Sequence, residues 1–357
     1  MNMPLLHERA VVTEADLGDP QSCARIDDFV LQHPQSTPFH LTRWLRAVAA
    51  GTGQTAHCLV AESAAKGIEG LLPLHVVSSP LFGRALVSSG FAVGGGILAI
   101  NQGVADRLAE AAWKLAQVHK CSSAELRGGA LPQSHWIIKS DAHANFARPL
   151  MADADAELLA IPRKQRAEVR KGLDKGLTVE TGNGARDLDW HYRVYSESVR
   201  NLGTPVFPKA LMREVLKAFG DDADILTVLA DNQPVASVLS LYHKGSVMPY
   251  WGGGVFAARG LRANDVMYYA LMNHARRRRC VAFDFGRSKV GSGAYAFKKN
   301  WGFEPHPLSY ALRTADGAEP RDINPNSPKY KAKIALWQKL PLPVANMVGP
   351  WIAKGLG

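Results

Sequence analysis

The stretch AFDFGRSKVGSGAYAFKKNWGFE, residues 282–304, carries the strongest fold signal in the chain. Its opening residues alternate around Asp284 as a short buried strand does, and residues 294–301 have the length of a short helix. Gly302 is placed to take the left-handed conformation that ends a helix, and Phe303 then begins another buried strand. The stretch therefore predicts strand, loop, helix and strand, which is an α/β arrangement.

The segment that leads into this stretch occurs twice in the chain. Each copy has two apolar strands joined by a polar turn, three consecutive glycines, a helix-period run, a cysteine and a short strand. The paired features are residues 57–75 and 226–243, Gly94–Gly96 and Gly252–Gly254, 105–120 and 265–279, Cys121 and Cys280, and 124–127 and 282–285. The glycines are 158 residues apart and the cysteines 159, so the spacing is kept across the copy. A tandem duplication explains this best.

Length and composition agree with two globular domains. The chain has 357 residues, of which 46% are hydrophobic and 21% charged. We predict two tandem α/β units with mixed sheets flanked by helices: an N-terminal domain at 1–150, a C-terminal domain at 151–312, and a basic amphipathic tail at 313–357. The first copy has no counterpart of Phe297-Lys298, so we expect it to be structural and the second to hold the site.

The charge and the ends of the chain suggest where it acts. A net charge of +10 favours an anionic partner, namely a phosphate-bearing substrate, RNA or an anionic membrane surface, and we expect no DNA partner. No apolar run approaches the roughly 18–20 residues of a membrane span, and residues 1–16 lack a signal-peptide pattern, which predicts a cytoplasmic protein. The four separated cysteines predict buried thiols rather than a zinc site or disulfides.

A family resemblance rests on the same stretch. A helix that closes on Gly302 before Phe303 resembles the last part of GNAT (N-acyltransferase) enzymes. The pattern F-K-x-x-W-G at 297–302 resembles the FKxxFG signature of FemAB-type proteins, which are themselves tandem GNAT-like units. Residues 283–310 and the run IPRKQRAEVRKG at 161–172 look like a FemAB-related branch associated with PEP-CTERM and exopolysaccharide systems. The resemblance covers most of residues 40–312.

The resemblance implies a transferase that moves an acyl or aminoacyl group to an amine or hydroxyl of a cell-envelope or exopolysaccharide precursor. It implies no required cofactor, with acyl-CoA or aminoacyl-tRNA as donor, and an anionic partner such as a diphosphate precursor, acyl-CoA or charged tRNA. Two rivals stay open: an acyl-CoA-dependent N-acyltransferase, and a non-catalytic scaffold of an envelope-polysaccharide assembly. Two departures weigh against ordinary acetyl-CoA use. The glycine-rich pyrophosphate loop is replaced by AARGLRA at 257–263, and Lys298 stands where GNAT enzymes often have a general-acid tyrosine.

The catalytic candidates are Lys298 and Asp284. The Lys298 ammonium can hold a substrate phosphate or a developing oxyanion, the alternative being a solvated helix lysine. Asp284 can orient or deprotonate an attacking amine, and Arg287 can bind substrate just after the strand end, the alternative being an ion pair between these two residues.

The other substrate-binding candidates lie on loops and one helix. Ser288 and Ser292 belong to the donor-rich loop 286–293, which is otherwise a flexible connection. Tyr250 and Trp251 precede the second triple glycine and can form a wall for a sugar or acyl chain, the alternative being a core strand ending in a bulge. Three arginines share one face of a predicted helix bracketed by Pro162 and Gly172, where they either bind an anion or form a solvated basic face. They are Arg163, Arg166 and Arg170.

The C-terminal tail has an amphipathic pattern of its own. Tyr330, Ile334 and Trp337 fall on one helical face with lysines around them, and an apolar run from Val344 to Trp351 follows. Residues 329–356 therefore either contact the inner face of the cytoplasmic membrane peripherally or dock across the protein itself.

Overall fold

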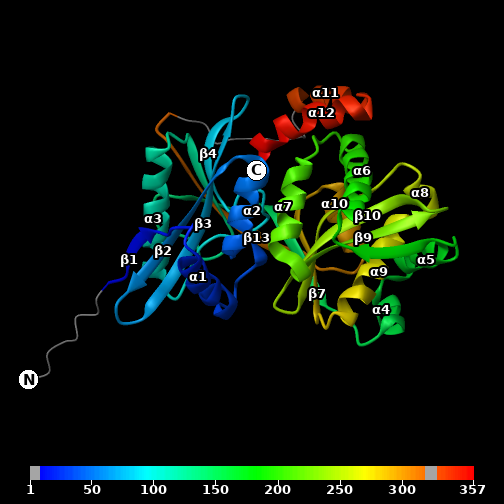
Figure 1. Cartoon of the computed structure of the whole chain (residues 1–357), viewed down its shortest axis with the longest axis horizontal. Helices are drawn as coiled ribbons and strands as arrows, with labels where there is room; N and C mark the ends of the chain where they lie inside the picture. Colours follow the sequence, from blue (N-terminus) through cyan, green and yellow to red (C-terminus); the bar gives the residue numbers. More distant parts are fainter. Residues whose placement is uncertain (1–8, 318–327) are drawn as a thin grey trace, which may run out of the picture. The chain divides into compact units, whose positions relative to one another are not determined.

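The computed structural model describes residues 9–317 and 328–357, and omits the side chains of residues 328–332. The chain divides into two compact units. Unit 1 comprises the described residues of Met1–Lys139, Ser309–Arg321 and Gly355–Gly357, and unit 2 comprises those of Ser140–Leu308 and Asp322–Lys354. Figure 1 shows both units, each with a sheet and flanking helices.

Unit 1 is a mixed sheet in the order β1-β2-β3-β4-β6-β13, with β5 beside β3. Only β4 and β6 run parallel among the described pairs of this unit. Its elements are β1 (Val11–Glu14), α1 (Pro20–Gln32), the 3-10 turn Pro38–His40, α2 (Thr42–Thr52), β2 (Thr55–Ser63), β3 (Gly67–Ser79), β4 (Gly83–Ser88), β5 (Leu98–Ala99), α3 (Gln102–Val118), β6 (Ser123–Arg127) and β13 (His306–Thr314).

Unit 2 is a mixed sheet in the order β7-β12-β11-β10-β9-β8. Here β11 and β12 are the parallel pair. Its elements are β7 (Ile137–Pro149), α4 (Ala154–Ala160), α5 (Arg163–Leu173), β8 (Thr178–Gly182), α6 (Ala185–Asn201), α7 (Lys209–Phe219), the 3-10 turn Gly220–Asp222, β9 (Ala223–Ala230), β10 (Gln233–His243), β11 (Ser246–Gly254), α8 (Ala258–Leu261), α9 (Ala263–Arg277), β12 (Ala282–Lys289), α10 (Gly293–Asn300), α11 (Pro328–Gln338) and α12 (Leu342–Ala353).

The duplication is visible element by element. The series β2-β3-β4-α3-β6 of unit 1 corresponds to β9-β10-β11-α9-β12 of unit 2. In both series the first three strands are antiparallel, and the strand after the helix pairs in parallel with the third. The predicted pair of tandem α/β units with mixed sheets is therefore confirmed.

The strand that completes each sheet changes the predicted domain limits. β12 pairs with β7, which follows the first repeat in the chain, and β6 pairs with β13, which follows the second. Residues 140–150 therefore belong to unit 2 and residues 309–312 to unit 1, and the tail is not a separate part because its described residues 328–354 group with unit 2. Boundaries at 150 and 312 need correction, because a strand belongs with the partner that satisfies its backbone hydrogen bonds.

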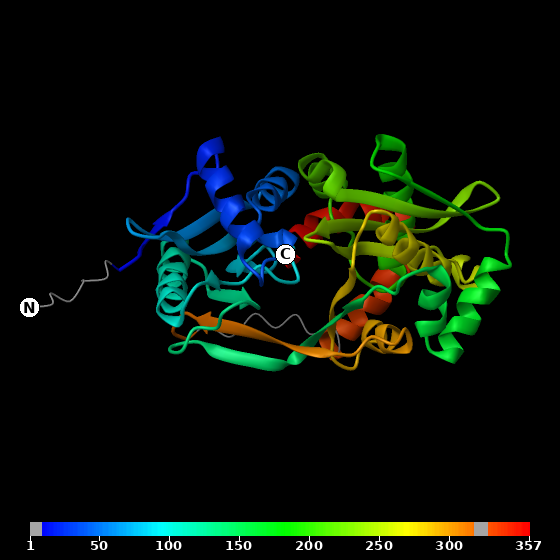
Figure 2. The same ribbon diagram turned by 90° about the horizontal axis from the view of Figure 1, so that it is seen from below.

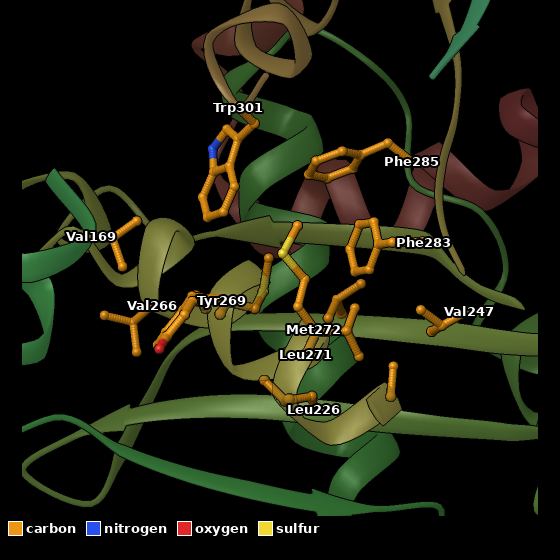
Figure 3. Packing of buried hydrophobic residues seen from close by; sticks show 14 of the residues in the cluster. Val169, Leu226, Val247, Val266, Tyr269, Leu271, Met272, Phe283, Phe285 and Trp301 are labelled. Atoms are coloured by element: carbon orange, nitrogen blue, oxygen red, sulfur yellow. The ribbon is translucent and has the colours of Figure 1, made fainter. Parts of the chain in front are cut away.

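Strand alternation places helices on both faces of the unit 2 sheet (Figure 2). Leu226 and Val238 point into the cluster formed with α9. The residues directly beside them in these strands, Thr227 and Ser237, point to the other face, where the Ser237 hydroxyl lies 3.0 Å from Nδ1 of His191 on α6. The α9 face holds the aromatic core, and Figure 3 shows Phe283, Phe285 and Trp301 packed there with Met272.

Two simpler sequence expectations concern thiols and membrane spans. All four cysteines are buried free thiols, and burial raises the pKa of the Cys121 thiol to about 11, so this group stays protonated and inert near neutral pH. Among the described residues, none of the helices combines the length and apolar character needed to cross a bilayer.

Candidate functional site

The candidate site lies where β11 and β12 separate. These parallel strands pair only at Ser246–Ala282 and Val247–Phe283 among the described residues. β11 then continues to Gly254 and β12 to Lys289, while each remains paired to its outer neighbour. The facing edges carry backbone N–H and C=O groups that need partners from outside the sheet. A parting of this kind offers a binding site made largely of backbone.

A bulge in each strand accompanies the parting. In β11 the partners of Leu239 and Ser240 are Trp251 and Pro249, so Tyr250 is the extra residue. In β12 the register shifts between Asp284 and Arg287. Gly286 lies inside this shift with a φ of 69°, a left-handed conformation that glycine adopts without steric cost. The bulges bend both strands just beyond their last shared pairs.

Lys298 and Asp284 meet at the β12 bulge and hold its shape. The Lys298 ammonium donates to the carbonyl oxygens of Gly286 at 2.9 Å and Arg287 at 3.1 Å. Asp284 accepts from the Gly286 N–H at 2.8 Å and from the side-chain amide of Asn145 at 3.0 Å. Both candidates therefore position the bulge, and Lys298 is not the solvated helix lysine that the sequence left open as its alternative.

Burial shifts the proton affinity of both groups. Lys298 is 9% exposed, and desolvation lowers its pKa to about 8 against the opposing attraction of Asp284. Desolvation raises the pKa of Asp284, while its bonds to Gly286 and Asn145 and the charge of Lys298 act in the other direction. The two groups therefore influence each other's charge across the bulge, while their hydrogen bonds go to the backbone and to Asn145.

The F-K-x-x-W-G signature has a structural explanation in this geometry. The Trp301 side chain is fully buried, and the Phe297 ring lies 6.1 Å from it and 6.3 Å from Phe285. These rings seat α10 on β12 so that Lys298 reaches the bulge. Gly302, with a φ of 81°, ends the helix as predicted. Phe303 is buried as expected, although the next strand begins three residues later, at His306.

The predicted aromatic pair flanks the parting on β11. Trp251 is buried, and its ring lies 4.9 Å from the ring of half-buried Tyr250. Phe207, in the segment between α6 and α7, contacts Trp251 at 6.2 Å and completes an aromatic wall that the sequence did not identify. The following glycines fit the packing alternative, since a Cβ at Gly253 would lie 2.2 Å from the Ser198 hydroxyl oxygen of α6.

On β12, Arg287 and Ser288 lie at the parting and Ser292 does not. Arg287 is partly exposed, and its charge helps to lower the pKa of Lys298. The Ser288 hydroxyl is buried and has no hydrogen-bond partner among the described residues. Ser292 caps α10 by accepting from the Tyr295 N–H at 3.2 Å, which gives this residue a structural role. The predicted loop 286–293 is strand as far as Lys289.

The connection from β11 to α9 differs from a pyrophosphate loop. A short helix, α8, occupies it, and Arg262 precedes α9 in a left-handed conformation without a side-chain cap. The backbone N–H groups of Phe256, Ala258, Arg259, Leu261 and Arg262 are all donated to acceptors within the chain. The acceptor for Phe256 is the Glu197 carboxylate at 2.9 Å. This segment therefore offers few free donors for phosphate.

The predicted basic helix forms as α5 and lies against the start of α9. Gln165 donates to Asp265 at 2.6 Å, and Glu168 pairs with Arg262 at 2.6 Å. Arg166 is partly used, since it donates to the Leu159 carbonyl at 3.0 Å. Arg163 and Arg170 are exposed, and no partner of either is seen in the described part of the chain. These two remain candidates for binding an anion.

Comparison with known proteins agrees with the fold. Residues 163–299 match the family model of acetyltransferase (GNAT) domains. The structure of FemX superposes with a TM-score of 0.63 at 15% identity, covering 81% of this chain and 95% of FemX. A tandem GNAT protein from the clavulanic acid biosynthesis pathway gives a TM-score of 0.54 at 13% identity, covering 88% and 100%. The C-terminal domain of a putative lysylphosphatidylglycerol synthetase from Agrobacterium fabrum gives 0.53 at 14%, covering 83% and 93%.

These findings define a tandem GNAT-fold protein. The matched acetyltransferase domain lies in its second unit, and the tandem GNAT protein shares the predicted two-unit fold. The predicted FemAB resemblance is confirmed at the level of fold by FemX. No protein of curated function matches the chain in sequence.

Proposed function

We propose that unit 2 transfers an acyl or aminoacyl group to an amine or hydroxyl of a cell-envelope or exopolysaccharide precursor. The observation that carries the proposal is the parting of β11 and β12 after two residue pairs. Backbone N–H groups fixed along such an edge can stabilise the oxyanion of a tetrahedral intermediate, and acyl transfer between two bound substrates depends mostly on positioning. No metal or resident cofactor enters this proposal.

An aminoacyl-tRNA, or another donor unlike acetyl-CoA, is the preferred acyl source. The N–H groups of five residues between β11 and α9 are already used, and the Glu197 carboxylate lies among them. A pyrophosphate placed there would find few donors and a like charge. A donor held by the parted strands and the aromatic wall does not need that loop.

Two exposed arginines support an anionic substrate. Arg163 and Arg170 lie on α5, which packs against the start of α9. Arg287 adds a third cation at the parting itself. A diphosphate precursor, acyl-CoA or charged tRNA would each be attracted to these charges. Unit 1 is assigned a structural role in this proposal, and the reaction is assigned to the cytoplasm.

Thermal unfolding of the full chain with a panel of ligands tests the proposal. The panel contains acetyl-CoA, longer acyl-CoAs, charged tRNA, and nucleotide- or lipid-diphosphate sugars. A ligand at about 100 times its dissociation constant adds about 2.7 kcal/mol to the free energy of unfolding. We expect charged tRNA or a diphosphate sugar to stabilise the protein, and Arg287→Ala to remove most of that stabilisation.

Arg213→Ala is the matched control, because Arg213 is exposed on α7 and pairs only with its neighbour Glu214 in the described contacts. Stabilisation by acyl-CoA alone would assign the chain to the acyl-CoA-dependent N-acyltransferases. If no ligand of the panel stabilises the protein, the transferase proposal is overturned and a non-catalytic scaffold is favoured. Transfer of a radiolabelled acyl group to the bound acceptor then distinguishes binding from turnover.

A further inference from the structure

The C-terminal helix α12 is packed with its small residues inward and its large apolar residues outward. Ala345, Gly349 and Ala353 are buried. Val344, Met347 and Trp351 lie on the opposite side and are 39%, 74% and 54% exposed. Their spacing of three and four residues places them on one face of the helix. A helix that contributes only to a core would bury its large residues instead.

The inward face docks closely on unit 2. α12 packs against α6, as Figure 1 shows, and the Asn346 amide donates to the Ser196 hydroxyl at 3.2 Å. A Cβ at Gly349 would lie 3.1 Å from the backbone nitrogen of Val206, so glycine permits the close approach. α11 also contacts α6, because the Arg200 side chain of α6 donates to the Gln338 carbonyl of α11 at 3.1 Å. The docking alternative for the tail is therefore present, and it leaves the outer face uncovered.

The charged residues of the tail segment all have one sign. Residues 328–357 contain five lysines and no aspartate or glutamate. Of these, Lys333 and Lys339 are exposed on or just after α11, beside Leu336, which is 68% exposed. Tyr330 and Lys331, which the sequence placed on the same surface, lie outside the described side chains. Tryptophan and lysine around an apolar face are typical of helices that lie in a membrane interface.

We propose that the outer face of α12, formed by Val344, Met347 and Trp351, seats this chain on an anionic membrane surface. The apolar side chains enter the interface while the lysines meet acidic headgroups. A second copy of the chain is a poorer occupant, because a two-fold contact would set the same lysine-rich surface against itself. Such attachment does not depend on any chemistry at the parted strands.

Co-sedimentation of the full chain with vesicles tests this surface. Vesicles of phosphatidylcholine containing phosphatidylglycerol are compared with vesicles of phosphatidylcholine alone. We expect binding to the anionic vesicles, and a drop of about tenfold or more for Met347→Ser/Trp351→Ser, because two large apolar contacts are lost. Added salt should weaken the binding. The matched control is Val118→Ser/Leu159→Ser, at side chains 75% and 63% exposed on other helices.

The double variant should unfold at the temperature of the wild type, since the replaced side chains face solvent. Unchanged vesicle binding by the double variant, or no binding of the wild type to anionic vesicles, would overturn the proposal. Self-association of the wild type that the double variant abolishes would assign the face to a second copy and would also overturn it. Neither result depends on acyl transfer, so failure here is distinct from failure of the proposed function.

Discussion

The two repeats treat the same strand pair differently. In unit 1, β4 and β6 pair over four residues, from Ala85–Ser123 to Ser88–Leu126. In unit 2, the corresponding β11 and β12 pair over two. The chain that leaves β4 folds back beside β6, where Ile97 bridges to Gly129, whereas the chain that leaves β11 enters α8. A duplicated fold thus supports one closed copy, in which the parallel strands stay paired, and one open copy, in which they part.

Local contacts explain why each copy keeps its state. In unit 1 the Arg127 guanidinium donates to the carbonyl of Ala92 at 3.0 Å, and its backbone N–H donates to the Ser88 hydroxyl at 2.8 Å. In unit 2 the strand end is a bulge held by Lys298. The lesson is that the residues after the strand, more than the strands themselves, decide whether the parallel pair parts.

The largest expected effect is at the closure of unit 1. A Cβ at Gly96 would lie 1.7 Å from the backbone oxygen of Gly128, so Gly96→Ala forces backbone apart. We expect a loss of about 3–5 kcal/mol in the free energy of unfolding, measured by urea denaturation. Gly94→Ala is the control, because its nearest neighbour would be Phe39 at 4.0 Å. Equal stability of the two variants would show that unit 1 is not closed in this way.

The next effect is at the bulge of unit 2. Lys298→Met leaves the carbonyls of Gly286 and Arg287 without their donor, which should cost about 2 kcal/mol. Lys299→Met, on the exposed side of α10, should stay within about 0.5 kcal/mol. Hydrogen exchange of residues 284–289 should rise only in the first variant. A stable Lys298→Met with unchanged exchange would remove Lys298 from the positioning role.

The lowered pKa of Lys298 adds a pH dependence to this comparison. The folded state releases the proton near pH 8 and the unfolded state near pH 10.5, so the unfolded state holds more protons between these values. The stability of the wild type relative to Lys298→Met should therefore increase as the pH rises from about 8 to 10.5. Chemical denaturation across that range gives the measurement, and a decrease would contradict it.

A smaller effect is expected at the first turn of α9. Burial raises the pKa of Asp265 from 3.8 to about 6, so the folded state keeps a proton that the unfolded state has lost. Stability therefore falls as the pH rises from about 4 to 6, and Asp265→Asn should gain about 1–2 kcal/mol at pH 7 and nothing below pH 4.

Asp106, its counterpart on α3, accepts the Gln133 N–H at 3.0 Å, so Asp106→Asn should show no gain. Denaturation midpoints of both variants at pH 4 and pH 7 make this comparison. A gain for Asp265→Asn that is the same at both pH values would point to a cause other than the carboxyl proton.

The smallest expected effect on stability distinguishes the N-terminus of α3 from that of the corresponding helix α9. Asn101 caps α3 by accepting the Val104 N–H at 3.0 Å, so Asn101→Ala should cost about 1 kcal/mol. Arg262 precedes α9 with a φ of 56° and no side-chain cap, so Arg262→Gly should be close to neutral, the easier backbone conformation offsetting a surface ion pair. Thermal unfolding of both variants checks this, and a larger cost for Arg262→Gly would reverse the assignment.

Much of the fold was predictable because its signals are local. Apolar periodicity identified α3, α9 and the two hairpins, and Pro162 and Gly172 bracketed α5. The site was predictable only in part. Lys298, Asp284, Arg287 and Ser288 do meet at one strand end, but Lys298 and Asp284 serve the bulge, and Ser292 caps a helix. A sequence shows that a lysine follows a strand, but it does not show which backbone carbonyls lie within its reach.

The sequence by itself determined the duplication, the α/β class and the short helix that ends at Gly302, because spacing and backbone preference act between near neighbours. The tertiary structure alone decided three further features. They are the completion of each sheet by the strand after the other repeat, the early parting of β11 from β12, and the outward apolar face of α12. Each depends on which distant segment satisfies a backbone edge or covers a helix face. That choice is made by hydrogen bonding and packing across the chain, which residue order does not record.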